Sequence, residues 1–431
     1  MSLLKEKKIY KLIKDLFPIN RSITGNGNRQ TLRIIQSKVK NLKILEFKSG
    51  QKVFDWKIPA EWNVKDAYVK SKNNKIIDFK KNNLHLISYS IPIKKYVKRK
   101  ELFDHLHTNK KFKNSIPYLT SYYKKYWGFC VSENHKKKIK GNNFFVNIES
   151  NFKKKGSLTI GEVLIKGESS KEVLLSSNIC HPSMANNELS GPTILTYIAK
   201  YLSKRKNKYS YRILFVPETI GAITYLSKKH KTLKKNFIAG FTLSCIGDEG
   251  EFSMIETQNS NSYSDKIAKE IIKKYKNKKI YKFTECGSDE RQFNYPGIDL
   301  PVVTLTRSKF GTYKEYHTSD DNLKFITAKS LGKSFRFVKD IIDKIENNYK
   351  KNYRIFATTK CEPFLSKRKL YRAISDTEWG LKSHEYLLFN VLYYSDGRRI
   401  SDIKEILKCD GKRLKKIIDL LSSHKLIKKV N

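Results

Sequence analysis

The chain has 431 residues, 39% of them hydrophobic, which excludes an intrinsically disordered protein and suits two or three domains with their own cores. Lys and Arg number 88 against 41 Asp and Glu, a formal net charge of +47, so the surrounding field favours anionic partners such as a small anionic substrate or a nucleic acid. Because the lysines are spread along the whole chain, a general bias in amino-acid usage is the preferred explanation of this charge.

Nothing in the chain is typical of export or of membrane insertion. Residues 1–17 alternate lysines with apolar residues and lack the continuous apolar segment of a signal peptide. No run of about 18 apolar residues occurs, so we expect no membrane span. The six cysteines are irregularly spaced and form no Cys-x-x-Cys pair, as in a protein whose thiols stay reduced. These features predict a cytoplasmic protein and leave its oligomeric state open.

The first 150 residues divide into a helical start and an aromatic-rich segment. Residues 1 to about 45 follow the spacing of an amphipathic helix, a polar loop over residues 21–27, and a second helix. Residues 53 to about 145 contain short alternating runs, such as Leu84–Tyr89, that are typical of strands. We expect residues 51–149 to form an inserted β-rich lid domain beside the site, with a core built on Trp56, Trp62 and Trp127.

Residues 150–350 alternate short apolar runs with helical patterns, as in an α/β protein. Four runs, at 172–176, 211–216, 237–246 and 300–305, have the continuous apolar character of strands buried on both faces of a sheet. One amphipathic helix lies between the first two runs, and a last helix follows the N-cap candidate Thr327. The pattern predicts an α/β fold with a three-layer sandwich.

Residues 365–431, after a linker over 353–369, form a separate pattern. Three short helices at 385–394, 400–407 and 412–421 precede a strand at 426–430, an order that predicts a winged helix. In the third helix, basic residues line the face opposite the apolar one, as in a helix that contacts nucleic-acid phosphates; they are Lys412, Arg413, Lys415 and Lys416. A solvated lysine face, or a winged helix that binds protein, explains the same pattern.

Polar residues follow the predicted strands of the α/β segment, where open sheets carry their sites. The segments concerned are residues 180–191, 217–221, 244–248 and, much later in the chain, 316–321. Because the carboxyl ends of parallel strands lie at one edge of a sheet, we expect His181, Asn187, Glu218 and His317 to meet in one cleft.

These segments resemble the co-catalytic zinc exopeptidases of the bacterial leucyl aminopeptidase type, whose motifs have the same order and spacing. A closer resemblance is to an aminopeptidase-like family often encoded near polysaccharide biosynthesis loci, which has an inserted domain and a winged-helix tail. The strings that carry it are Phe54-Asp55-Trp56, Ile116-Pro117-Tyr118, Val216–Gly221, Gly287–Gln292 and Glu315–Ser319. The resemblance implies a zinc-exopeptidase fold over residues 1–50 and 150–350.

The resemblance also implies roles for individual residues. His181 and His317 fall on histidine ligands of the metal, and Glu218 falls on the general base that takes a proton from the attacking water. Asn187 falls on the position of the carboxylate that bridges two zinc ions. A neutral amide is a poor bridge between two dications.

Three further positions depart from the pattern. Thr219 replaces a glutamate ligand, Ser244 replaces an aspartate ligand, and Ser183 replaces the aspartate that orients the first histidine. With these carboxylates absent, we expect at most one zinc ion, held by the two histidines and Asn187. The neighbouring Glu188 can supply a ligand only by turning toward the metal, and successive residues usually point apart.

Other residues are weaker candidates for substrate contact or auxiliary roles: Asp248, Asp289, Arg291, Tyr316, His105 and His107. Asp289 and Arg291 belong to an Asp-Glu-Arg string that forms a buried ion pair as readily as a site. His105 and His107 in the insertion suit a second ligand pair or a substrate clamp, although an ordinary surface position is the preferred interpretation.

The sequence therefore predicts an aminopeptidase-like metallohydrolase that cleaves an amide or ester bond of a small peptide or acylated-sugar substrate, with a degenerate metal site. One rival is a non-catalytic ligand-binding protein on the same fold, favoured by the missing carboxylates. Another is a nucleic-acid-associated regulator, favoured by the charge of +47 and the tail.

Overall fold

The computed structural model describes residues 3–349, 353–370 and 384–430. These residues form two compact units, Met1–Ile342 and Asp343–Asn431. The described part of the chain contains no helix that combines the length and the apolar character needed to cross a bilayer.

An eight-stranded mixed sheet is the centre of the first unit. Its strands, in spatial order, are β1 (Lys43–Lys48), β10 (Ser157–Ile165), β12 (Ser210–Val216), β11 (Glu172–Asn178), β13 (Phe237–Leu243), β16 (Val302–Thr306), β14 (Ser253–Ile255) and β15 (Lys279–Tyr281). The four middle strands β12, β11, β13 and β16 run parallel, and every residue of β11 and β12 is buried. The four apolar runs are therefore the parallel strands that the sequence predicts.

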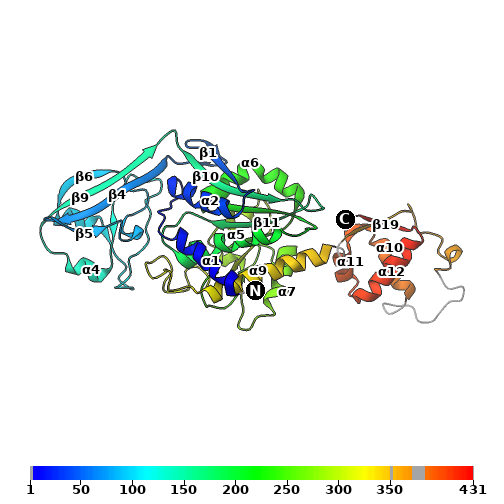
Figure 1. Cartoon of the computed structure of the whole chain (residues 1–431). Coiled ribbons are helices and arrows are strands. Elements are labelled where there is room, and N and C mark those ends of the chain that lie inside the picture. Colours follow the sequence, from blue (N-terminus) through cyan, green and yellow to red (C-terminus); the bar gives the residue numbers. More distant parts are fainter. Residues whose placement is uncertain (1–2, 350–352, 371–383, 431) are drawn as a thin grey trace. The chain divides into compact units, whose positions relative to one another are not determined.

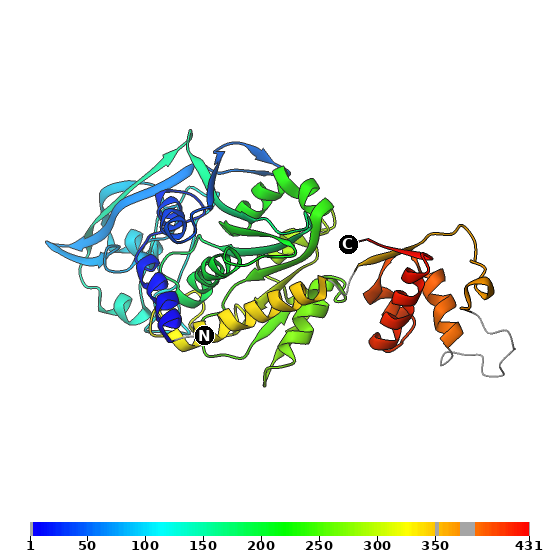
Figure 2. The same ribbon diagram turned by 45° about the vertical axis from the view of Figure 1, so that its right-hand side comes forward.

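Helices cover both faces of this sheet, which gives the predicted three layers. On one face α1 (Leu3–Leu16) and α2 (Asn26–Lys38) both contact α5 (Ser190–Leu202), and α9 (Ala328–Asn348) lies beside α5 (Figure 1). On the opposite face lies α6 (Ile220–Asn236), seen from another side in Figure 2, and it contacts α8 (Glu290–Phe293). The remaining long helix, α7 (Tyr263–Ile272), packs on β13 and β16. Thr327 caps α9 as expected, because its hydroxyl accepts from the backbone N–H of Ser330 at 3.0 Å.

Residues 43–45 differ from the sequence prediction. They were expected at the end of a helix, but α2 ends at Lys38 and residues 43–48 form β1. This strand pairs antiparallel with β10 from Lys43 opposite Glu162 to Lys48 opposite Ser157. Pairing with the edge of the sheet outweighs the local helical pattern, since β propensity depends on the neighbouring strand.

The insertion forms a sheet of its own that is separate from the main sheet (Figure 1). Its strands, in spatial order, are β5 (Asn74–Asp78), β4 (Glu61–Ser71), β9 (Asn143–Lys153) and β6 (Ile93–Lys98). Smaller elements complete it: β2 (Lys52–Val53), β3 (Trp56–Lys57), α3 (Arg99–Asp104), β7 (Leu106–His107), β8 (Phe129–Cys130) and α4 (Glu133–Lys138). No strand of the insertion threads through the main sheet among the residues described.

The insertion shares its core with the main domain. Val69 and Phe144 of the small sheet belong to the same buried cluster as Leu174 and Leu214 of the main sheet. At its first residue, β4 is also tied down by an ion pair: Glu61 accepts from Arg29 of α2 at 2.5 Å. The insertion is thus anchored to the main domain by packing and by charge.

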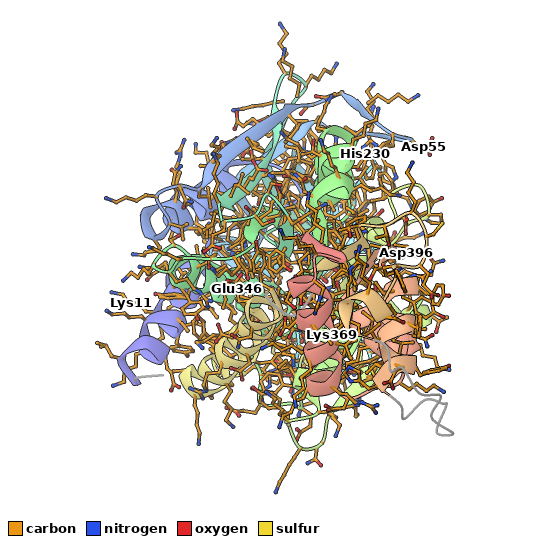
Figure 3. The ribbon with its side chains drawn as sticks, turned by 90° about the vertical axis from the view of Figure 1, so that its right-hand side faces the viewer. Lys11, Asp55, His230, Glu346, Lys369 and Asp396 are labelled. Carbon is orange, nitrogen blue, oxygen red and sulfur yellow. The ribbon has the colours of Figure 1, made fainter. Side chains whose placement is uncertain are left out.

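Two of the three tryptophans expected in the core of the insertion are there. Trp62 and Trp127 are 3% and 7% exposed, but the expectation for Trp56 was wrong, since its side chain is 40% exposed. Trp56 lies in β3, directly after the two-residue turn Phe54–Asp55 that joins it to β2. The hairpin leans on α6, with the Phe54 ring 5.7 Å from the His230 ring, and Figure 3 shows Asp55 and His230 at this edge. A lone two-stranded hairpin buries few side chains by itself, and the ring that Trp56 packs on, Tyr123, is itself 57% exposed.

The C-terminal unit has the predicted helices and closing strand. They are α10 (His384–Tyr393), α11 (Ile400–Ile406), α12 (Gly411–Ser423) and β19 (Ile427–Val430). The expected linker over 353–369 contributes a strand, β17 (Arg354–Ala357), which pairs with both β19 and β18 (Asp396–Arg399). Ile355 of β17 is fully buried in the core of this unit, so the fold begins before residue 365.

Candidate active site

The candidate residues lie at the carboxyl ends of the parallel strands. His181 comes three residues after β11, and Glu218 comes two residues after β12. Asn187 lies in a π-helical turn, Ala185–Leu189, that opens α5. His317 lies in the long connection between β16 and α9. The ring centroids of His181 and His317 are 5.2 Å apart, well inside the separation that two ligands of one metal allow.

His317 has a buried nitrogen without a partner. Its Nε2 atom is buried and has no hydrogen-bond partner among the described residues. Burial and the neighbouring His181 lower the pKa of His317 to about 3, so the ring is neutral at physiological pH. Its backbone has φ 53°, a left-handed conformation that is uncommon for a residue with a side chain. A neutral, partnerless imidazole nitrogen in a buried position suits a metal ligand.

One ring nitrogen of His181, Nδ1, is bonded to a carboxylate, and the other, Nε2, faces the candidate site. Its Nδ1 atom lies 2.7 Å from Glu188 Oε2, and its Nε2 atom lies 3.8 Å from Glu218 Oε2. Burial opposes a charge on this ring, but the neighbouring Cys180 and Glu188 raise the pKa of His181 well above its usual range. A cation that binds Nε2 therefore has to displace a proton from it.

Glu218 is fixed by a hydroxyl group. Ser288 donates to Glu218 Oε1 at 2.5 Å, which leaves Oε2 facing His181. Burial raises the pKa of Glu218, while His181 and Ser288 oppose the rise. Thr219, the next residue, has φ 62°, and its N–H donates to Asp289 Oδ1 at 2.7 Å. A raised pKa and a fixed carboxylate are the properties that a general base needs near neutral pH.

Asn187 faces uncharged groups. Its Oδ1 accepts from the Cys245 thiol at 3.4 Å, its Nδ2 lies 3.5 Å from the sulfur of Met184, and its backbone carbonyl accepts from Ser244 at 3.4 Å. Asn187 and Ser244 are the positions at which the resemblance expects two carboxylate ligands. They are neighbours in space, but they present an amide and a hydroxyl instead of two negative charges.

Glu188 points to the other side of His181. Its Oε1 accepts from the backbone N–H groups of Cys180 and His181, the latter at 2.9 Å. Asn187 and Glu188 thus point apart, as expected for successive residues. Among the described residues, Cys180, His181 and Glu188 form the one cluster of three His, Cys, Asp or Glu side chains close enough to share a metal ion. This set is unsuitable, because His181 Nδ1 is already bonded to Glu188 and burial raises the pKa of the Cys180 thiol to about 12.

The weaker candidates divide between the site and structural roles. Tyr316 stacks on His317 with ring centroids 3.9 Å apart, and Asp289 binds the backbone beside Glu218. Asp248 instead lies 3.8 Å from Arg307, and its N–H donates to Asn186. Arg291 is exposed, and its side chain donates to the carbonyl of Ser288.

The two histidines of the insertion bond to the insertion itself. His105 stacks on Trp127 with ring centroids 3.8 Å apart, and its Nδ1 lies 2.7 Å from the Trp127 carbonyl. His107 Nε2 lies 2.7 Å from the hydroxyl of Tyr126. These contacts explain both residues as parts of the folded insertion.

The insertion supplies a residue that sequence reasoning missed. Tyr118 lies with its ring 5.0 Å from His181 and 5.3 Å from His317, and its N–H donates to the His317 carbonyl at 2.9 Å. The adjacent Pro117 forms a β-bridge with Thr318, and Ser319 donates from its N–H to the Ile116 carbonyl. The string Ile116-Pro117-Tyr118 was a signal of the family, but nothing local in it indicated contact with a residue 199 positions later.

Arg21 is a second missed residue. It is completely buried, and its side chain donates to the carbonyls of His181 at 3.1 Å and Leu16 at 2.7 Å. The turn-forming residues around it concealed this role. Arg21 connects the N-terminal helices to the loop that carries His181.

Comparisons with known proteins agree with this arrangement. Residues 10–348 match the family model described as a domain of unknown function (DUF4910), and residues 353–429 match a winged helix-turn-helix family. A protein of Clostridium acetobutylicum named "Putative polysaccharide biosynthesis protein with aminopeptidase-like domain" is 45% identical over 426 residues, 98% of this chain and 96% of that protein.

Solved structures show the same fold. The crystal structure of a "putative peptidase" from Clostridium acetobutylicum has a TM-score of 0.80 and 43% identity, and the match covers 99% of this chain and 97% of the other. A zinc aminopeptidase from Bacillus subtilis, BSAP, has a TM-score of 0.58 and 14% identity over 79% of this chain and 95% of its own. The second likeness supports the fold alone.

Proposed function

The chain belongs to the DUF4910 family with an appended winged helix, and on that basis we propose that it is an aminopeptidase-like metallohydrolase with a single-metal site. In this proposal residues 1–50 and 150–350 form the hydrolase domain, residues 51–149 the inserted lid, and the C-terminal winged helix a separate module. The observation that carries it is the convergence of His181, His317 and Glu218, with an unpartnered nitrogen on His317.

The donor set fits one divalent metal ion. His181 is bonded through Nδ1 and turns Nε2 toward Glu218, and His317 Nε2 has no hydrogen-bond partner among the described residues. Imidazole is a common zinc ligand. Asn187 supplies an amide oxygen as the third proposed ligand. One metal tolerates neutral ligands, whereas two adjacent dications need a bridging anion to offset their repulsion. When bound, a zinc ion supplies Lewis acidity.

Side chains of the protein supply the proton transfers. Glu218 takes a proton from the attacking water through Oε2 and returns it to the nitrogen or oxygen that leaves. Ser288 holds the other oxygen of Glu218, so the carboxylate keeps its direction during both transfers. Tyr118 and Tyr316 pack against the histidines and keep bulk water away from them.

The substrate class proposed is a small amide or ester, either a peptide or an acylated sugar. The net charge of +47 favours an anionic substrate, and a related protein is named for polysaccharide biosynthesis. The test is hydrolysis of aminoacyl and acetyl-sugar model substrates by zinc-loaded protein, with Glu218→Gln as the variant that keeps the histidines and removes the base. We expect activity in the wild type and a loss of at least about 100-fold in the variant.

The same experiment distinguishes a non-catalytic binding protein. If the wild type binds zinc but shows no hydrolysis that is lost in Glu218→Gln, the protein is a ligand-binding protein and not a hydrolase. If zinc does not bind and His181→Ala changes nothing, the metallohydrolase proposal is wrong.

The winged helix supports a second proposed function, binding to nucleic acid. In α12 the basic side chains Lys412, Lys415 and Lys416 are exposed, while Leu414 and Ile417 are buried. The basic face is thus available to phosphates. A fluorescence titration of the full chain with duplex DNA at several salt concentrations tests this proposal, since each phosphate contact adds about −0.9 to the slope of log K against log salt. A slope near zero would leave protein binding as the function of this module.

A further inference from the structure

The carboxylate that holds His181 comes from an unexpected position. Glu188 is 2% exposed, and its two oxygens have separate tasks. Oε1 accepts from the backbone N–H groups of Cys180 and His181, and Oε2 lies 2.7 Å from His181 Nδ1. Glu188 therefore fixes both the backbone and the ring of the proposed metal ligand.

At position 183 the resemblance expects the aspartate that orients His181, but Ser183 bonds to other residues. The Ser183 hydroxyl donates to the Phe17 carbonyl at 3.2 Å and accepts from Asn83 at 2.8 Å. Its backbone has φ 48°, so the loop itself has a left-handed residue at this point. The Ser183 hydroxyl thus bonds to Phe17, directly after α1, and to Asn83 of the insertion, and in the described part of the chain no bond joins it to His181.

The local backbone explains how Glu188 reaches the histidine. Residues 185–189 form a π-helical turn, in which hydrogen bonds span five residues, as from Leu189 N–H to the Met184 carbonyl at 3.2 Å. Ala185, Asn186 and Asn187 are held from the other side by Asp321, whose carbonyl and carboxylate oxygens accept their N–H groups. The turn is thus clamped in the conformation that directs Asn187 to Ser244 and Glu188 to His181.

The charge of Glu188 is balanced inside the protein. The Arg21 side chain is buried beside Glu188. Arg21 donates a hydrogen bond to the backbone carbonyl of His181, and the backbone N–H of His181 donates one to Glu188. A buried carboxylate without such partners would be costly. Here it has two backbone donors, one imidazole and a nearby guanidinium.

We propose that Glu188 is the positioning residue of His181, which replaces the orienting carboxylate missing at position 183 and directs Nε2 of the histidine to the metal. The resemblance expects a carboxylate at position 187, whereas this chain has Asn187 followed by Glu188. The carboxylate of this chain therefore lies one residue later, where it faces Nδ1 of His181. The inference rests on the proposed single-metal site and explains why that site keeps a strong first ligand.

The test compares Glu188→Gln with a matched control, Glu172→Gln. Glu172 is also a buried glutamate, but it pairs with Arg212 and touches neither histidine. Zinc affinity of each full-length variant is measured by competition with a chelator. We expect a 10- to 100-fold weaker affinity in Glu188→Gln and an unchanged affinity in Glu172→Gln. Equal affinities of wild type and Glu188→Gln would overturn the inference.

A second measurement does not depend on metal. A proton on His181 Nδ1 that is bonded to a carboxylate gives a strongly downfield imidazole N–H signal in the proton NMR spectrum, assigned by its loss in His181→Asn. We expect this signal in metal-free wild type and its upfield shift in Glu188→Gln. Its absence from the wild type overturns the inference even if the Gln variant does not fold. Failure of the wild type to bind zinc, with the signal present, instead refutes the proposed function alone.

Discussion

Replacing Asn187 by aspartate is the sharpest test of the single-metal site. Asn187 is 7% exposed and contacts two sulfur atoms and the Ser244 hydroxyl, none of which carries a positive charge. Asp321 is close by, since it accepts the backbone N–H of Asn187 at 2.8 Å, and burial raises the pKa of Asp321 to about 7. A new carboxylate here is buried and unpaired, so we expect metal-free Asn187→Asp to lose about 1–3 kcal/mol of stability.

Zinc should reverse this loss. The added charge supplies the anion that bridges metals in the resembling enzymes, and we expect zinc affinity to rise by about 10- to 100-fold. That rise corresponds to about 1.4–2.7 kcal/mol, close to the loss in the metal-free state. The urea midpoint of Asn187→Asp should therefore lie below that of the wild type with chelator present and near it with saturating zinc.

Asn186→Asp is the matched control. Asn186 is completely buried, and its Oδ1 accepts from the backbone N–H groups of Gly247 and Asp248, away from Ser244. The same chemical change there should destabilise the protein without a gain in zinc affinity. Two zinc ions bound per wild-type chain would refute the reasoning, as would an equal zinc response of both variants.

Three other predictions concern the anchoring of the insertion, the support of His317 and the winged helix. Burial opposes the charge of Glu61, but the bonds from Arg29 outweigh it and lower the pKa of Glu61 from 4.5 to about 2. The stability that the ionised Glu61 contributes is present above pH 4.5 and is lost as the pH falls toward 2, so Glu61→Gln should flatten this part of the acid-unfolding profile. Tyr118→Ala removes the ring that packs against both histidines and should weaken zinc binding at least about 10-fold, whereas unchanged binding would show that His317 is held by its own loop. Lys415→Gln should reduce the salt slope of DNA binding by about 1, and an unchanged slope would place phosphate contacts elsewhere.

The sequence by itself determined the parallel strands, the edge of the sheet that carries the site, and the winged helix. Four apolar runs predicted the parallel strands β11, β12, β13 and β16, because strands buried on both faces have no polar alternation. The positions directly after these runs predicted that His181 and Glu218 lie together, since parallel strands end at one edge. The winged helix followed in the same way from the spacing of its short helices.

Tertiary structure decided which way the side chains of the site point. Glu188 faces His181 because a π-helical turn, clamped by Asp321, sets its direction, and the sequence shows neither the turn nor the clamp. His317 keeps its left-handed backbone next to residues 116–118 of the insertion, and that contact joins segments 199 or more positions apart. Local patterns report the period of a helix or strand. They carry no information on contacts that form only when distant segments pack, and such contacts fix the direction of each ligand here.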